Sequence, residues 1–351
     1  MKRTQSSSSR SKIADLSPPV SHFSADNGVV YHLERVIGKG GYGMVYSCMT
    51  DTGVRCALKT AKSYSLVIEA EVLKAVNKKN CRHFCRLLDE GFSATMNDHY
   101  IVMEIMGPSF VDLRNMLPAK KFSLHTGLRV SMQMLNAIEE LHTCGFISRD
   151  VKPSNFVVGL DFPRCRMVHM IDFGISKKIV DARGELLKRR SHGGWRGTGR
   201  YCSLANHMKK DQCRRDDVES WFYVASEVMR GKLPWVNISK TDRDLLFAAK
   251  KSIRGINRQE FFKKLPGFMY DILVIIDNCD YSTTPDYQKI YAMFDEEMKN
   301  QKLDYKADYD WEECPFFVAM KGRSSTKTDD TSGTMYAVAP SSATIPMTDF
   351  E

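Results

Sequence analysis

The sequence lacks an apolar run long enough to cross a membrane, because no stretch of about 20 residues is free of charge. Its N-terminal segment, MKRTQSSSSRSK, is basic but lacks the apolar core of a secretory signal peptide. These absences argue against a membrane protein and against secretion. We therefore expect a protein of the cytoplasm, with the nucleus as the alternative, and no membrane partner.

Paired metal ligands at zinc-finger spacing are also missing. The tightest cluster of candidate ligands is Cys81, His83 and Cys85, and no second pair accompanies it, so a metal site is the minor interpretation. The ten cysteines are scattered through apolar segments. In a chain without a signal peptide this predicts reduced and mostly buried thiols.

Nucleic-acid-binding motifs and long basic runs are absent, although the chain has a formal net charge of +9. Such a charge favours acidic partners, and we expect acidic or phosphorylated protein segments, not nucleic acid. The hydrophobic fraction of 43% and the charged fraction of 26% are typical of a globular protein. The 351 residues suffice for one large two-lobed domain or two ordinary domains, and we expect a monomer.

Two tails are predicted to be disordered, the Ser-rich residues 1–27 and the Ser- and Thr-rich residues 316–351. Between them, residues 28–315 form one globular region without a linker or an internal repeat. The first part predicts strands, at VVYHLERVIG, MVYSCMT, VRCALKT and HYIVMEIM. A helix before the last of these strands places Glu69, Val72, Leu73 and Val76 on one face.

The later part of this region is predicted to be mostly helical. One helix carries an apolar stripe of Leu128, Met132, Leu135, Ile138 and Leu141, and DDVESWFYVASEVM is apolar almost all round, as a buried helix would be. The sequence therefore predicts an α+β fold with two lobes, a small β-rich lobe with one main helix and a larger, mostly helical lobe.

A glycine-rich motif follows the first predicted strand, Gly38-Lys39-Gly40-Gly41-Tyr42-Gly43-Met44-Val45. Alone it is weak, since dinucleotide-binding folds share it and an ordinary glycine turn is the alternative. Here, however, a strand resumes after the glycines. They are thus expected to form a hairpin whose backbone N–H groups fold over phosphates.

Lys59 is the only charge within the apolar triplet Ala57-Leu58-Lys59 of a predicted strand. Either it faces solvent, or it is a cation that holds phosphates and is oriented by a helix carboxylate. Glu69 is the candidate carboxylate, because the apolar face of its helix then packs behind it, and Glu71 is the alternative.

Asp150, Lys152 and Asn155 have the spacing of a phosphoryl-transfer loop. Asp150 is suited to orient a substrate hydroxyl, Lys152 to neutralise charge on the transferred group, and Asn155 to bind a hard cation. The segment could be an ordinary turn. A second oxygen ligand for magnesium, Asp172, ends an apolar strand further on, and four motifs in this order favour phosphoryl transfer.

This order of motifs resembles that of the protein kinases. Three segments resemble the casein kinase 1 group, namely HYIVMEIMGPSFVDLRN, GTGRYCSLANH and RRDDVESWFYVASEVMRGKLPW. That group lacks the Ala-Pro-Glu sequence that ends the activation segment of most kinases, and in this chain Cys202-Ser203-Leu204-Ala205-Asn206 stands in its place. The phrases WRGTGRYCS, DYSTTPDYQKIYAMF and ADYDWEE resemble the tau-tubulin kinase branch. The resemblance covers residues 28–315 and implies an N-lobe at 28–103, a hinge at 104–107 and a C-lobe at 108–315.

The resemblance also implies ATP and Mg²⁺ as cofactors and assigns further residues to them. Met103 would be the gatekeeper, Glu104 and Met106 would bind adenine at the hinge, and Asp112 would reach the ribose. The expected ATP-binding set includes the glycine-rich segment and the residues around the adenine ring, namely Ile37, Gly38, Lys39, Gly40, Gly41, Tyr42, Gly43, Met44, Val45, Ala57, Lys59 and Val157.

For the substrate, the resemblance places Thr198 beside Asp150 and Asp217 under the loop as its cap. Arg200 and Arg243, with Gly231 nearby, would form an anion pocket that favours acidic or previously phosphorylated proteins, with solvated surface charge as the alternative. Cytoskeletal proteins are the substrate class that the resemblance suggests.

Ser148 departs from the family, which usually has His at this position. A smaller side chain would leave a void and weaken the coupling between the lobes, but it touches neither phosphate nor metal. We therefore expect an active serine/threonine kinase, since Asp-x-Lys-x-x-Asn is the serine/threonine form. A pseudokinase that docks acidic segments without turnover is the alternative. Phosphorylation of Ser191 in the basic segment KRRSHGG is a further hypothesis for ordering this region.

Overall fold

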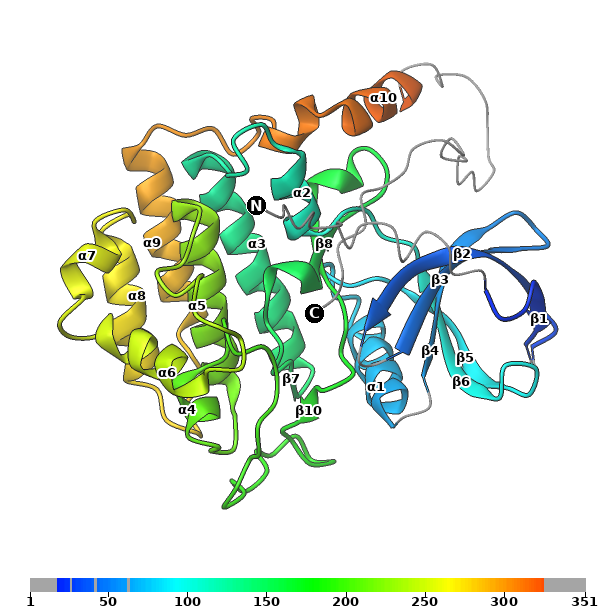
Figure 1. Ribbon diagram of the computed structural model, residues 1–351, viewed down its shortest axis with the longest axis horizontal. Coiled ribbons are helices and arrows are strands. Elements are labelled where there is room, and N and C mark those ends of the chain that lie inside the picture. The colour runs from blue at the N-terminus through cyan, green and yellow to red at the C-terminus, as the bar shows by residue number, and fades with distance from the viewer. Residues whose placement is uncertain (1–17, 26, 41–42, 62–63, 325–351) are drawn as a thin grey trace, which may run out of the picture. The chain divides into compact units, whose positions relative to one another are not determined.

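The computed structural model describes residues 18–25, 27–40, 43–61 and 64–324 (Figure 1). Contacts between Cα atoms divide them into two compact units. The sheet unit comprises the described residues up to 66 and residues 86–105, and the helical unit comprises residues 67–85 and 106–324.

The sheet unit is one antiparallel sheet of six strands in the order β1-β2-β3-β4-β6-β5. Residues at alternate positions form its apolar core, including Tyr46, Leu58 and Val102, because one face of each strand is buried. The strands are β1 (His22–Ser24), β2 (Val30–Gly40), β3 (Gly43–Thr50), β4 (Arg55–Ala61), β5 (Leu87–Ser93) and β6 (Asp98–Glu104).

The globular part begins earlier than residue 28. His22–Ser24 pairs with β2, and Phe23 is only 2% exposed between the rings of Tyr31 and Tyr100, at centroid distances of 5.4 and 5.0 Å. The expectation of a disordered tail through residue 27 is therefore wrong for this strand, because one buried aromatic ring fixes a polar segment. Residues 1–17 lie outside the described part.

The helical unit is built around α5 (Arg214–Arg230), in which every residue from Asp216 to Met229 is buried. This confirms the expected buried helix. Helices α3, α5, α8 and α9 pack side by side (Figure 1). The helices are α1 (Ser65–Lys78), α2 (Phe110–Met116), α3 (Leu124–Thr143), α4 (Leu204–His207), α5, α6 (Arg243–Ser252), α7 (Arg258–Phe262), α8 (Phe268–Asp277), α9 (Tyr287–Asn300) and α10 (Pro315–Ser324).

Short strands in the helical unit position the loops that follow them. β7 (Phe146–Ile147) pairs with β10 (Lys177–Lys178), and β8 (Phe156–Val158) pairs with β9 (Val168–Met170). Three 3₁₀ turns complete this unit, η2 (Pro153–Asn155), η3 (Arg164–Arg166) and η4 (Asp310–Glu313). Two loops that leave these ladders, at residues 148–155 and after Met170, carry most of the candidate catalytic residues.

The C-terminal boundary also differs from the expected one. Residues 315–324 form α10, and Phe317 is fully buried next to the 3₁₀ turn that buries Trp311. The expected disorder from residue 316 is therefore wrong for this helix, while residues 325–351 lie outside the described part. Among the helices of the described ranges, none combines the length and apolar character of a membrane span.

Candidate active site

Three side chains converge on the carboxylate of Asp150, which is 5% exposed. Its Oδ2 lies 3.0 Å from the Nζ of Lys152 and accepts a hydrogen bond from the Nδ2 of Asn155 at 3.3 Å. Its Oδ1 accepts a hydrogen bond from the Oγ1 of Thr198 at 2.9 Å. The carboxylate is therefore held in one orientation next to a cation and a hydroxyl.

Asn155 combines a paired nitrogen with an unpaired oxygen. Its Nδ2 also donates to the backbone oxygen of Asp150 at 3.0 Å, and its Oδ1 is buried without a hydrogen-bond partner among the described residues. Buried polar atoms are rarely unpaired, so such an atom suggests a missing ligand. The backbone oxygen of Asn155 accepts from the N–H of Ile171 at 2.9 Å, which brings the adjacent Asp172 close to the same loop.

Two non-glycine residues of this region have left-handed backbones, Arg149 and Asp172, each with φ of 65°. Such conformations cost about 1–3 kcal/mol and persist where the surroundings enforce them. Arg149 is held by its guanidinium, which donates to the backbone oxygens of Ile175 and Ser176. Its burial, with Arg190 and Arg196 nearby, lowers the pKa of Arg149 to about 10.

Asp217, on the buried helix α5, holds the start of the loop at residues 148–155, as expected. Its carboxylate accepts the backbone N–H groups of Ser148 at 2.6 Å and Arg149 at 2.9 Å. The Nε2 of His142 donates to the same carboxylate at 3.0 Å, and the Nδ1 of this ring bonds the hydroxyl of Tyr287. Sequence reasoning missed His142 and Tyr287, because neither belongs to a motif.

Ser148 contributes to the loop with its own hydroxyl. Its Oγ accepts the backbone N–H of Asp150 at 3.2 Å, and the side chain is buried. Phe173, which is also fully buried, contacts Phe84 with a centroid distance of 5.6 Å. Ser148 thus makes a hydrogen bond to the loop backbone that was not expected from the sequence.

The segment from Trp195 to His207 lies against this loop. Gly197 has φ of 89°, and a Cβ there would lie 2.2 Å from the backbone oxygen of Arg149, so only glycine fits. Lys250 is fully buried and donates to the backbone oxygens of Gly199 at 2.7 Å and Cys202 at 2.6 Å. No sequence pattern distinguishes this lysine from its exposed neighbour Lys251.

In the sheet unit, strand register places four of the predicted nucleotide residues on one face. Val45 lies opposite Lys59, and Ala57 lies opposite Met103. Because Ala57 and Lys59 are two residues apart on β4, all four side chains share a face. Met44 lies on the opposite face, packed against the apolar core, so its side chain does not join this group.

Lys59 is only 7% exposed, which contradicts the solvent-facing alternative. Glu69 on α1 is 2% exposed together with the buried Val72, Leu73 and Val76, whereas Glu71 is exposed. The structure therefore favours Glu69 over Glu71 as a functional carboxylate.

The hairpin from β2 to β3 brings Gly40 opposite Gly43, and Gly38 opposite Val45. Gly43 has φ of 122°, and a Cβ there would lie 1.9 Å from the backbone oxygen of Thr60. Ile37 and Lys39 belong to β2, whereas Gly41 and Tyr42 lie outside the described residues. The expected glycine hairpin is thus present on both sides of its tip.

Asp112 has a structural contact that the sequence did not predict. Its carboxylate accepts hydrogen bonds from the backbone N–H and the hydroxyl of Ser109, and so closes a capping box at the start of α2. The connection between β6 and α2 pairs with β8 through its backbone. The N–H of Gly107 donates to the backbone oxygen of Val158 at 2.8 Å, and the N–H of Val158 donates to the backbone oxygen of Pro108 at 3.1 Å. Met106 is half-buried at the start of this connection, Val157 is buried, and Glu104 at the end of β6 bonds the backbone N–H of Arg86.

The expected anion pocket of Arg200, Arg243 and Gly231 stays a prediction, because the described contacts neither assemble nor exclude it. The guanidinium of Arg243 lies over the ring of Trp195 at 4.0 Å, and Arg200 donates to the backbone oxygen of Val236 at 3.3 Å. Gly231 instead lines a pocket with Arg114 and Lys121. Arg200 and Arg243 thus each have a contact that orients them, and their remaining N–H groups are still able to bind an anion.

Comparison with known proteins agrees with this geometry. Residues 31–264 match the model of the protein kinase domain. The chain belongs to the protein kinase family. Its antiparallel sheet, helix α1 and largely helical C-terminal region form the kinase fold predicted from the sequence.

Three related proteins show where the chain lies within the family. It is 33% identical over 299 residues to the serine/threonine-protein kinase spe-6 of Caenorhabditis elegans, covering 84% of this chain and 78% of the relative. A probable serine/threonine-protein kinase of Dictyostelium discoideum is 30% identical over 279 residues, covering 79% of this chain and 55% of the relative. A casein kinase I-like protein of Caenorhabditis elegans is 28% identical over 295 residues, covering 81% and 83%.

Proposed function

We propose that this protein is an active serine/threonine protein kinase, which transfers the γ-phosphate of ATP to hydroxyl groups of protein substrates. The observation that carries the proposal is the buried carboxylate of Asp150, held by Lys152, Asn155 and Thr198. Such an arrangement orients an acceptor hydroxyl and places a cation where negative charge develops. The serine/threonine kinases among its relatives support the same substrate class.

Asp150 accepts the proton of the acceptor hydroxyl, whose oxygen attacks the γ-phosphorus as the bond to ADP breaks and ADP leaves. Lys152 stabilises the transferring group, and Thr198 keeps the carboxylate turned toward the acceptor. We assign Lys59 and Glu69 to the phosphates of ATP, together with the glycine hairpin. Val45, Ala57, Met103, Glu104, Met106, Asp112 and Val157 are assigned to its adenosine part.

Magnesium fits the residues on the loop. The unpaired Oδ1 of Asn155 and the carboxylate of Asp172 are hard oxygen ligands, which magnesium prefers. Protein kinases hold the magnesium ions that accompany ATP with an Asn and an Asp of this kind. When bound, the ion would neutralise phosphate charge. Asn155 and Asp172 are therefore the residues that we assign to metal binding.

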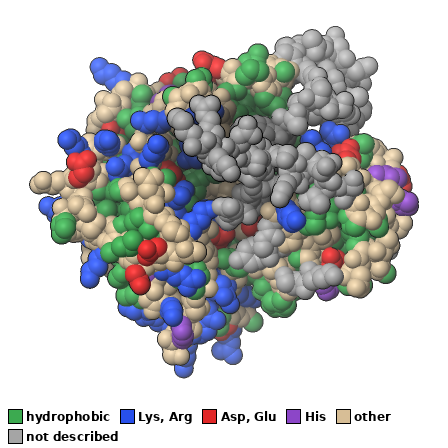
Figure 2. Space-filling model, in the orientation of Figure 1, with side chains coloured by type: hydrophobic (Ala, Val, Ile, Leu, Met, Phe, Trp, Pro, Cys, Tyr) green, Lys and Arg blue, Asp and Glu red, His purple; other side chains and the backbone are tan. Residues whose placement is uncertain are grey.

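We further propose a tau-tubulin-kinase-like specificity, supported by WRGTGRYCS and DYSTTPDYQKIYAMF and by the excess of positive charge. Lys and Arg side chains are spread over the visible face of the helical unit, with few acidic side chains between them (Figure 2). Acidic, phosphorylated or cytoskeletal proteins are the substrates that suit such a surface.

The test is transfer of labelled phosphate from ATP and magnesium to dephosphorylated casein and to tau. We expect the Asp150→Asn variant to lose activity by about 10²-fold or more, because it keeps the volume but not the carboxylate. Thermal unfolding of both proteins controls for folding. Equal transfer by the variant would contradict the assigned role, and ATP binding without any transfer by the parent would favour a pseudokinase that docks acidic segments.

A further inference from the structure

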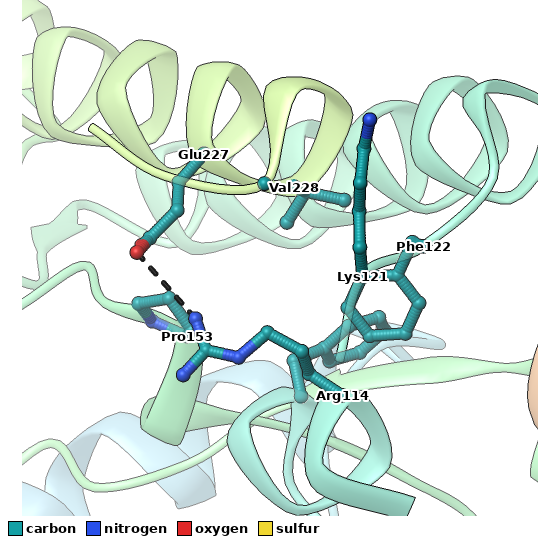
Figure 3. Close-up of a pocket in the computed structure, with 8 residues that line it drawn as sticks. Arg114, Lys121, Phe122, Pro153, Glu227 and Val228 are labelled. Atoms are coloured by element: carbon teal, nitrogen blue, oxygen red, sulfur yellow. Dashed lines mark hydrogen bonds and ion pairs between the residues drawn. The ribbon is translucent and has the colours of Figure 1, made fainter. Parts of the chain in front are cut away.

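A small pocket of the helical unit lies beside the loop that carries Lys152 (Figure 3). Pro153, the next residue of this loop, forms part of its wall. The remaining lining comes from α2, α5 and the connection after α2, and consists of Phe110, Arg114, Lys121, Phe122, Glu227, Val228 and Gly231. Apolar walls and three charged side chains therefore meet next to the proposed phosphate-transfer site.

The carboxylate of Glu227 lies on the far side of this pocket from the stem of Arg114 (Figure 3). It is 4% exposed, and its Oε2 accepts the hydroxyl of Tyr201 at 2.6 Å. Its Oε1 is 3.5 Å from the Nη1 of Arg114, the long limit of a hydrogen bond. Glu227 is thus anchored by a strong contact to Tyr201 and only weakly engages Arg114.

Arg114 retains unused donors toward the pocket. Its side chain is 31% exposed, and within the described residues its guanidinium makes no hydrogen bond except the one to Glu227. A planar guanidinium can bind a carboxylate or phosphate through two parallel N–H groups. The residue is therefore able to accept a second anion without leaving its place.

Lys121 supplies a second cation. Its stem passes over Gly231, where an added Cβ would lie 3.2 Å from its Cδ, and Gly231 has φ of 93° at the end of α5. Its ammonium is exposed and points away from Glu227 (Figure 3), and it has no hydrogen bond or ion pair among the residues that the structure describes. Two cations and one carboxylate leave the pocket with an excess positive charge.

We propose that the mouth of this pocket is a specificity subsite, where Arg114 and the exposed Lys121 bind an anionic side chain of the protein segment being phosphorylated. The inference rests on the proposed kinase function and names residues different from Arg200 and Arg243. A carboxylate and a phosphate share the recognising chemistry. A basic substrate residue is disfavoured, because the two cations would repel it and Tyr201 already occupies one oxygen of Glu227.

The first experiment measures kcat/KM for a set of peptides that have one Ser acceptor in an alanine background. Each peptide carries a single phosphoserine, Asp or Lys at one position on either side of the acceptor. We expect the anionic peptides to be preferred over the all-alanine peptide at one or two positions. In the Arg114→Gln, Lys121→Ala double variant this preference should fall by about tenfold, since charge-assisted hydrogen bonds are lost.

Lys121→Ala alone is the second variant, because replacing an exposed side chain does not endanger folding, and it should lose part of the preference. Lys299→Ala, which removes the same charge from the exposed face of α9, is the matched control and should keep the preference in full. Comparing phosphoserine with Asp distinguishes phosphate from carboxylate as the natural ligand. A parent enzyme that prefers Lys peptides, or has no charge preference, would overturn the proposal.

Binding without ATP separates this proposal from the proposed function. Fluorescence anisotropy with the best phosphopeptide should show tighter binding than with its dephosphorylated form, and the double variant should abolish the difference. If the parent binds selectively but transfers no phosphate, the kinase proposal fails and the subsite stands. If parent and double variant bind alike, the subsite is wrong whatever the activity.

Discussion

Ser148 shows how much a single buried hydroxyl contributes to the catalytic loop. It accepts the backbone N–H of Asp150 in a site without access to water. In Ser148→Ala this N–H is left unpaired, and we expect the free energy of unfolding to fall by about 1–3 kcal/mol. Chemical denaturation measures this loss, and kcat should also decrease because Asp150 is less well held.

The matched control for this prediction is Ser226→Ala. Ser226 is also fully buried, on α5, but its hydroxyl has no hydrogen-bond partner among the described residues. The same substitution there should change stability much less. Equal losses of unfolding free energy at both positions would show that the hydrogen bond from Asp150 to the Ser148 hydroxyl does not stabilise the fold.

Single residues are predictable from the sequence when a motif names them. Asp150, Lys152 and Asn155 meet as their spacing indicates, and Asp217 caps the loop. The contacts of Arg243 with Trp195 and of Gly231 with Lys121 belong to no motif and were not predicted. Which partner a surface arginine chooses depends on contacts between segments far apart in the chain, and no local pattern encodes them.

At the scale of elements, Lys250 links α6 to the segment that carries Thr198. It donates to two backbone oxygens, those of Gly199 and Cys202, at a fully buried position. Lys250→Met should leave the oxygen of Cys202 unpaired and that of Gly199 with only the weak thiol donor of Cys202 at 3.6 Å, so we expect a loss of about 2 kcal/mol in unfolding free energy. Activity should fall further than stability alone explains, because the hydroxyl of Thr198 no longer holds Asp150 in place.

Lys251→Met is the control, since the neighbouring lysine is exposed and the substitution is identical. Activity is measured at a temperature where both variants are fully folded. A folded Lys250→Met protein with the activity of the parent would show that the segment does not need this anchor.

Long elements with clear periodicity were predictable, whereas short terminal ones were not. The buried helix α5 follows directly from its apolar sequence. By contrast, β1 has three residues, and α10 is a short segment, PFFVAMKGRS, directly before the Ser- and Thr-rich residues; each has one buried ring, Phe23 and Phe317. Composition averages over such segments, so it misses an element that one side chain holds by tertiary contact.

At the scale of the whole molecule, an acidic residue anchors the long segment between Lys177 and α5. The buried carboxylate of Asp211 accepts hydrogen bonds from the Nζ of Lys177 at 2.7 Å and from the guanidinium and backbone of Arg190. Ser191, whose phosphorylation is our hypothesis for ordering this segment, is exposed beside it. Asp211 thus provides an anion for this basic segment without modification.

Asp211 should make the stability of the protein depend on pH in the acid range. Burial opposes its ionisation, but hydrogen bonds from Arg190 and Lys177 outweigh this and lower the pKa of Asp211 to about 2 from 3.8. Because the folded pKa lies below the unfolded one, this stabilisation is present above the unfolded pKa and is lost as pH falls toward 2. It amounts to about 2 kcal/mol.

Asp211→Asn should therefore unfold more easily than the parent at neutral pH, and the difference should shrink as the pH falls through the range from 3.8 to about 2. Denaturant unfolding at a series of pH values measures the difference. Asp271→Asn on the exposed face of α8 is the control and should give a curve parallel to that of the parent. If Asp211→Asn also runs parallel, then Lys177 and Arg190 do not stabilise the charged carboxylate, and the ordering of the segment must come from another contact, with phosphorylation of Ser191 as the first alternative.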